Sequence, residues 1–109
     1  MSGEKLADKV CIPCRGGVPP LTEAERAPLL AQLDGWQVVD GHHLSKDFRF
    51  DDFAQALDFA NRAGAIAEQQ AHHPELTIGW GHAKVEIWTH KIDGLTESDF
   101  VLAAKFDAL

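Results

Sequence analysis

The feature that most constrains the fold is a long alanine-rich segment at about residues 52–71. Its apolar residues recur every three or four positions, which predicts a helix with one apolar stripe. The stripe consists of Phe53, Leu57, Ala60, Ala63 with Gly64, and Ala67. Pro74 ends the helix. Because small side chains make up the second half of the stripe, a sheet or another helix can pack closely against it.

Two further helices are predicted by capping boxes, in which a threonine is followed three residues later by an acidic residue. The first box spans residues 22–25 and precedes a helix that runs to about Leu33. The second spans residues 96–99 and precedes a helix that runs to about Asp107.

Four segments have the alternating pattern of β-strands, and turn-forming residues separate them. They lie at residues 36–39, 42–50, 76–78 and 84–90. In the last of them, the alternation places His90 on the same sheet face as Trp88. The order of elements is α-β-β-α-β-β-α. This order predicts an α+β fold, with helices packed on one face of a four-stranded antiparallel sheet.

Composition narrows the classes of function. The chain has 109 residues and a net charge of −7, which argues against binding to nucleic acid through clustered basic residues. It contains no apolar stretch long enough to cross a bilayer and no signal-peptide core, so no membrane partner and a cytoplasmic location are expected. Residues 1–20 are rich in proline and glycine and are interpreted as a tail before a domain at residues 21–109.

Cys11 and Cys14 form a Cys-x-x-Cys motif within residues 1–20. Such a motif indicates zinc or redox chemistry in some proteins. A structural zinc site needs four ligands, which here requires a second subunit or help from His42 and His43. The remaining interpretation is a surface segment without chemistry.

The histidines are the candidates for chemistry. Glu68 and His72 are four residues apart and share a helix face, whereas Pro74 disfavours the helical conformation at His73 and lets it turn away. Imidazoles titrate near neutral pH and therefore suit proton transfer. The alternatives are a favourable cation at a helix end and a Glu/His/His metal site. His42 and His43 are interpreted as strand surface, and His82 as a turn residue.

Several residues at fixed spacing resemble one family. The pattern is Glu68-x3-His72-His73-Pro74, then Trp80, His90 and Asp99 after five, nine and eight intervening residues. This pattern resembles the signature of the pterin-4a-carbinolamine dehydratases. The resemblance covers residues 21–109 and extends to Gly35-Trp36 and Gly94-Leu95-Thr96.

The resemblance implies dehydration of 4a-hydroxytetrahydropterin to quinonoid dihydropterin, without a metal or an organic cofactor. This reaction recycles the cofactor of aromatic amino acid hydroxylases. The resemblance also implies a role for each matched residue: His72 binds the pterin, and His73 and His90 act as general acid and base. The supporting residues are Glu68, which orients the histidines, together with Trp36, Pro74, Trp80 and Asp99. Asp99 is equally well explained as a helix cap.

One departure and two alternatives accompany the resemblance. Many relatives carry an acidic residue directly before the two histidines, and Ala71 takes its place here. Some relatives act without catalysis, either as dimerisation cofactors of a transcription factor or as Rubisco assembly factors. The family also implies a homodimer or homotetramer, and a partner from the hydroxylase pathway.

Overall fold

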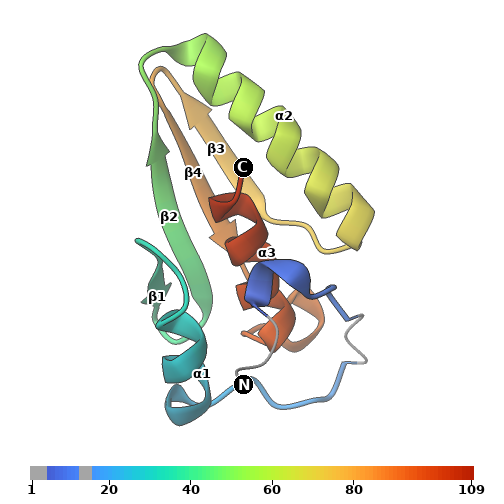
Figure 1. Ribbon diagram of the computed structural model, residues 1–109. Helices are drawn as coiled ribbons and strands as arrows, with labels where there is room; N and C mark the ends of the chain where they lie inside the picture. The colour runs from blue at the N-terminus through green and yellow to red at the C-terminus, as the bar shows by residue number, and fades with distance from the viewer. Residues whose placement is uncertain (1–4, 13–15) are drawn as a thin grey trace.

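The computed structural model describes residues 5–12 and 16–109, and its elements confirm the predicted fold class (Figure 1). Four antiparallel strands form one sheet in the order β1-β2-β4-β3. In chain order the elements are the 3₁₀-helix η1 (Leu6–Asp8), α1 (Glu23–Leu30), β1 (Gln37–Val39), β2 (His43–Arg49), α2 (Phe53–Gln70), β3 (Glu75–Gly79), β4 (His82–Ile87), η2 (His90–Ile92) and α3 (Glu97–Asp107). The two 3₁₀-helices are additions to the predicted order.

Local capping starts the helices where the sequence predicts. The Thr22 hydroxyl accepts from the Glu25 N–H at 3.2 Å, and the Glu25 carboxylate accepts from the Thr22 N–H at 2.8 Å. Asp52 accepts from the Gln55 N–H at 2.8 Å and thereby caps α2. These bonds satisfy N–H groups that have no partner within the helix.

The core lies between the sheet and the helices α2 and α3. Leu44, Val85 and Ile87 point from the sheet toward the helices and are fully buried. The predicted stripe of α2 is correct for its alanines but wrong for Phe53 and Leu57, which are exposed. The face that packs against the sheet is turned slightly, to Ala56, Phe59, Ala60, Ala63 and Ala67. The large ring that anchors this face is Phe59, which lies 4.4 Å from Phe48 between ring centroids.

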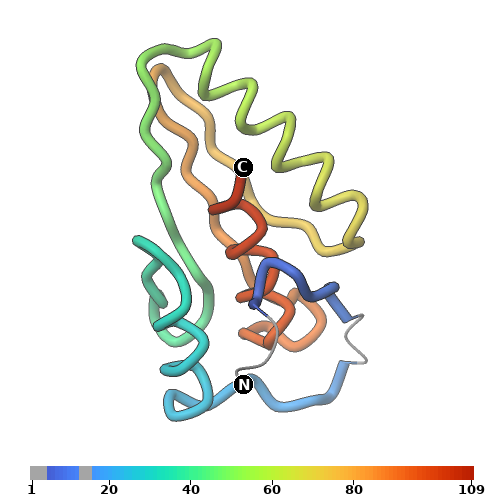
Figure 2. The backbone as a smooth tube through the Cα atoms, in the orientation of Figure 1, coloured from blue at the N-terminus to red at the C-terminus, as the bar shows by residue number. Residues whose placement is uncertain are grey.

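Helix α3 is buried on nearly all sides, because the N-terminal segment covers the side that the sheet leaves open (Figure 2). Leu6 is part of the core, and Lys105 of α3 donates to the Ala7 carbonyl at 2.9 Å. The described residues 5–12 therefore pack on α3. The division at residue 21 into a tail and a domain stays a prediction.

The last strand ends earlier than the alternation predicts. β4 stops at Ile87, and His90 opens η2 instead of continuing the strand. Thr89 pairs with Gly94 across a tight loop, with N–H to carbonyl distances of 2.8 and 3.4 Å. This pairing draws the chain away from the sheet, so the predicted strand position of His90 is wrong. Among the described residues, no helix is both long and apolar enough to span a bilayer.

Candidate active site

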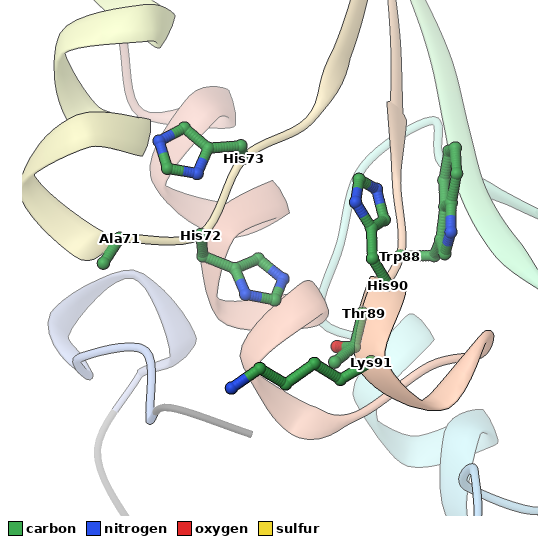
Figure 3. Close-up of a pocket in the computed structure, with 7 residues that line it drawn as sticks. All are labelled: Ala71, His72, His73, Trp88, Thr89, His90 and Lys91. Carbon is green, nitrogen blue, oxygen red and sulfur yellow. The ribbon is translucent and has the colours of Figure 1, made fainter. Parts of the chain in front are cut away.

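The three histidines with predicted catalytic roles line a single pocket (Figure 3). The pocket has a volume of about 210 Å³ and lies where the end of α2 faces the chain that follows β4. Its lining residues are Ala71, His72, His73, Trp88, Thr89, His90 and Lys91. This volume is below the roughly 300–1,000 Å³ of pockets for drug-sized ligands, and it suits a small ring system.

The end of α2 separates the two adjacent histidines. Ala71 adopts the left-handed conformation, with φ of 53° and ψ of 38°. The chain then leaves the helix axis, and Pro74 prevents a return to helical geometry. His72 consequently reaches Asp99 on α3, whereas His73 reaches back to Glu68 on α2. The predicted divergence of the two imidazoles is present.

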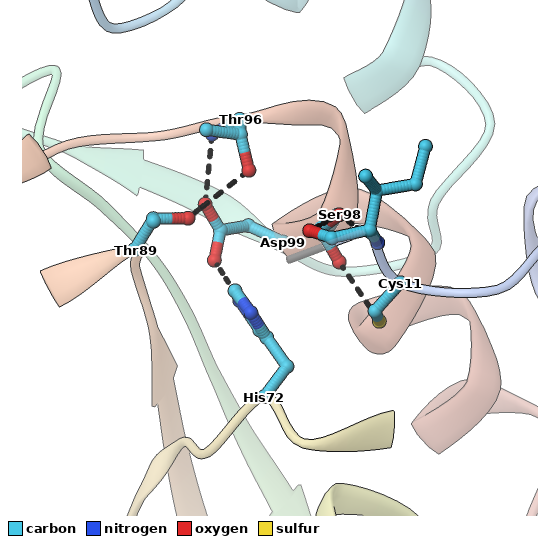
Figure 4. Close-up of polar contacts among 7 residues, drawn as sticks. Cys11, His72, Thr89, Thr96, Ser98 and Asp99 are labelled. Carbon is cyan, nitrogen blue, oxygen red and sulfur yellow. Dashed lines mark hydrogen bonds and ion pairs between the residues drawn. The ribbon is translucent and has the colours of Figure 1, made fainter. Parts of the chain in front are cut away.

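His72 is held by a buried carboxylate (Figure 4). Asp99 is fully buried, and its Oδ1 lies 2.5 Å from Nε2 of His72. Its Oδ2 accepts from the Thr89 hydroxyl and from the Thr96 N–H, each at 2.8 Å. The Thr96 contact makes Asp99 a helix cap as well as a partner of His72. Both roles inferred from the sequence therefore meet in one side chain.

The donors around Asp99 determine where the protons lie. An ionised carboxylate can only accept, so Nε2 of His72 carries a proton. The Thr89 hydroxyl donates its only proton to Asp99, so the Thr96 hydroxyl donates to Thr89, 3.0 Å away. The proton arrangement leaves Nδ1 of His72 as the ring nitrogen available to a ligand.

His73 and Glu68 form the more accessible pair. Nε2 of His73 lies 2.5 Å from Oε2 of Glu68, and the two side chains are 57% and 78% exposed. The i, i+4 spacing predicted that Glu68 shares a helix face with His72. The left-handed Ala71 ends that face one residue too early, and Glu68 instead contacts the next histidine. An exposed carboxylate can orient His73 while leaving its ring in contact with solvent.

Trp88 was not among the predicted site residues, although it lines the pocket beside His90. The ring centroids of Trp88 and His90 are 4.6 Å apart. Trp88 also contacts His42 and His43, with ring centroids 5.2 and 5.8 Å away. The sequence feature that could have identified Trp88 was its position two residues before His90. The alternation places it on the strand face opposite Val85 and Ile87.

The remaining histidines have carboxylate partners outside the pocket. Nε2 of His42 lies 2.7 Å from Asp93, and Nε2 of His43 lies 3.3 Å from Glu86. His43 is on strand β2, as predicted, and His42 precedes it. The prediction of a turn position for His82 is wrong, because His82 is the first residue of β4.

None of the five predicted supporting residues lines the pocket: Glu68 and Asp99 contact its histidines, and the other three are Trp36, Pro74 and Trp80. Trp36 is buried in the core, and its indole N–H donates to both carboxylate oxygens of Asp107 at 3.0 Å. Trp80 is 73% exposed at the tip of the β3–β4 hairpin. Pro74 links the histidines to β3. Direct pocket roles for these three residues stay predictions.

The Cys-x-x-Cys motif is only partly described, because Cys14 lies outside the described residues. Cys11 is half-buried, and burial raises the pKa of its thiol to about 11. The Lys105 ammonium opposes this rise in the pKa, and the Asp99 carboxylate adds to it. Within residues 5–12 and 16–109, no three His, Cys, Asp or Glu side chains are grouped to hold a metal ion.

The fold and the pocket define a class: an α+β protein with three histidines, two of them paired with carboxylates, around a small pocket. The chain belongs to the pterin 4 alpha carbinolamine dehydratase family, whose model matches residues 19–109. A protein of Rubrobacter xylanophilus is 60% identical over 105 residues, covering 96% of this chain and 98% of the relative. One from Methylococcus capsulatus is 47% identical over 110 residues, covering 100% and 96%. Both carry the name "Putative pterin-4-alpha-carbinolamine dehydratase".

A solved structure has the same fold. It is a transcriptional coactivator/pterin dehydratase from Brucella melitensis, with a TM-score of 0.77 and 40% sequence identity. The match covers 82% of this chain and 96% of the Brucella chain. The family assignment therefore has support from both sequence and fold.

Proposed function

We propose that this protein dehydrates 4a-hydroxytetrahydropterin to quinonoid dihydropterin by histidine acid–base catalysis. The observation that carries the proposal is the convergence of His72, His73 and His90 on one pocket. Membership of the dehydratase family supports the choice of a pterin as the ring system.

The reaction needs two proton transfers. The bond between the ring carbon and the hydroxyl oxygen breaks, and the leaving hydroxide takes a proton to depart as water. The adjacent ring nitrogen loses its proton, and its electrons form the new carbon–nitrogen double bond. One imidazolium and one neutral imidazole can perform both transfers, each worth about 10²–10⁴-fold in rate.

His73 and His90 are the proposed proton-transfer residues. Both line the pocket, and neither has the buried carboxylate partner that His72 has. His72 uses Nε2 for Asp99, so it is better suited to binding the pterin through Nδ1. Glu68 orients His73 through the contact with its Nε2. Trp88 offers an aromatic wall beside His90 against which a flat ring can pack.

Membership of the family supports a proposal for the wider role. We propose that the reaction recycles the pterin cofactor of aromatic amino acid hydroxylases in the cytoplasm. It proceeds without a metal or an organic cofactor, and the protein acts as a homodimer or homotetramer. A hydroxylase that produces the 4a-hydroxypterin is the corresponding pathway partner.

The test is the dehydration rate of enzymatically generated 4a-hydroxytetrahydropterin. Wild-type protein treated with a chelator is compared with His73→Ala and His90→Ala. The expected result is acceleration by the wild type and a loss of at least about 100-fold in each variant. His82→Ala is the matched control, because His82 contacts Asp47 on the sheet and does not line the pocket. No acceleration by folded wild type would refute the proposal.

A non-catalytic role is the second candidate, as a dimerisation cofactor or an assembly factor. The coactivator part of the Brucella protein's description favours it. A pulldown with the His90→Ala variant separates the two functions. A partner retained by the inactive variant indicates an interaction surface away from the pocket, whereas an inactive wild type that captures a partner supports the non-catalytic role alone.

A further inference from the structure

The N-terminal segment, residues 5–12, forms hydrogen bonds with residues next to the site. The Cys11 N–H donates to the side-chain oxygen of Gln70 at 2.9 Å. The Ile12 N–H donates to the Ser98 hydroxyl at 2.8 Å, and that hydroxyl donates to the Ile12 carbonyl at 3.2 Å. Figure 4 shows Cys11 and Ser98 beside Asp99. Two neighbouring residues of the segment thus bond to two different helices.

The bonded residues are next to the pair that fixes His72. Gln70 is the last residue of α2 and precedes His72 by two positions. Ser98 is in the first turn of α3 and directly precedes Asp99. Because His72 lies beyond the end of one helix and Asp99 at the start of the other, their contact depends on how these two helix ends are placed. The segment joins the two helix ends, and none of its described residues lines the pocket.

The N-terminal segment is itself anchored to the core and to α3, so it can hold the two helix ends in place. Leu6 is 3% exposed within the core. Lys105 donates to the Ala7 carbonyl at 2.9 Å, whereas the pair between Lys9 and Glu97 is exposed to solvent and contributes little. Ser98 is only 7% exposed, and its two bonds with Ile12 are partly buried. These anchors keep Cys11 and Ile12 over the junction of α2 and α3.

We propose that residues 9–12 form a positioning strap that holds the end of α2 against the start of α3, so that His72 stays on Asp99. Gln70 and Ser98 are the positioning residues through which the strap acts. The kinetic consequence rests on the proposed function, because it assumes that His72 binds the pterin. The geometric claim about the His72–Asp99 hydrogen bond does not rest on it.

Two pairs of variants test the strap in the full-length protein. Ser98→Ala removes both bonds to Ile12, and Ser98→Thr keeps a hydroxyl. Gln70→Ala removes the acceptor of the Cys11 N–H, and Gln70→Glu keeps one. Lys9→Ala is the matched control on the strap, because it removes only the exposed pair with Glu97.

The first readout is the ¹H–¹⁵N NMR signal of the Nε2–H of His72, compared with that of His73 in the same sample. We expect the His72 signal to lose its hydrogen-bonded shift, or to broaden, in both alanine variants, while His73 is unchanged. The second readout is kinetic: kcat/KM falls about 10-fold, mainly through KM, as expected for a displaced binding group. Ser98→Thr, Gln70→Glu and Lys9→Ala should behave as the wild type.

Each result decides one question. An unchanged His72 signal in a folded alanine variant overturns the strap, whatever the activity. A changed signal together with an inactive wild type supports the strap and refutes the proposed dehydratase function. If Ser98→Ala does not fold, the comparison of Gln70→Ala with Gln70→Glu decides by the same signal.

Discussion

Replacement of Asp99 by asparagine tests the central hydrogen bonds of the site. Asp99 accepts three bonds: from His72, from the Thr89 hydroxyl and from the Thr96 N–H. Asparagine has nearly the same shape but offers one acceptor oxygen and one donor amide. The backbone N–H of Thr96 can only donate, so the asparagine oxygen must take the Oδ2 position. The amide then faces Nε2 of His72, which must give up its proton and move it to Nδ1.

The magnitude follows from the three contacts. A hydrogen bond to a charged group contributes about 1.5–3 kcal/mol, and a neutral one about 0.5–1.5. Converting three such bonds to neutral ones lowers stability by about 3 kcal/mol, and removal of a buried charge offsets part of this loss. We therefore expect the free energy of unfolding to fall by about 1–3 kcal/mol. Alanine would instead leave three donors without an acceptor, at about 1–3 kcal/mol each, which is comparable with the stability of a whole domain.

Two measurements on Asp99→Asn test the predicted loss of stability and the predicted shift of the His72 proton. Chemical denaturation gives the loss in stability, and ¹⁵N NMR shows which ring nitrogen of His72 is protonated. Asp93→Asn is the control, because Asp93 pairs with His42 while 86% exposed, and such surface pairs contribute little. A stability within about 0.5 kcal/mol of the wild type, together with a proton still on Nε2, would refute the reasoning.

Three further predictions concern Ala71, a pair of glycines and Cys11. Ala71→Gly should raise the free energy of unfolding by about 0.5–1 kcal/mol in thermal or chemical denaturation, because glycine adopts the left-handed conformation without strain; an equal or lower stability would contradict this. Gly94→Ala should lower the free energy of unfolding by about 1–3 kcal/mol, because a Cβ there would lie 2.8 Å from two carbons of the Pro20 ring. Gly64→Ala, where a Cβ meets nothing within 4 Å, should instead stabilise helix α2, and equal effects at the two glycines would contradict the packing. In a Cys14→Ser variant, alkylation of Cys11 should be about 100-fold slower at pH 8 than for an ordinary thiol. It should accelerate as the pH rises toward the raised pKa of about 11, and labelling at pH 8 as fast as that of an ordinary thiol would contradict the raised pKa.

The fold could be predicted from the sequence because its signals are local. Capping boxes at Thr22 and Thr96 mark helix starts through bonds that span three residues. Alternation identified the strands for the same reason. The end of β4 was misplaced because it depends on pairing between Thr89 and Gly94, which alternation within the strand does not reveal. The packing of residues 5–12 on α3 was also out of reach, since Leu6 finds its partners about a hundred residues away.

The sequence indicated the three histidines that line the pocket and named Glu68 and Asp99 beside them, but not which histidine each carboxylate contacts. Spacing along α2 paired Glu68 with His72, and only the left-handed Ala71 shows why Glu68 contacts His73 instead. Trp88 was not predicted as a site residue, because its neighbours His42 and His43 are distant in sequence: His43 begins strand β2, and His42 precedes it. Trp36, in contrast, matched the family pattern and lies in the core.

Asp99 explains why a local signal and a functional one can coincide. As a capping residue it needs a single oxygen, and the Thr96 N–H takes Oδ2. The second oxygen would be costly to bury without a donor. His72 supplies that donor, so the same side chain that starts α3 also fixes the proton of the imidazole. The start of α3 and the choice of the His72 ring nitrogen that carries the proton are therefore coupled, and a change at either should be detectable at the other.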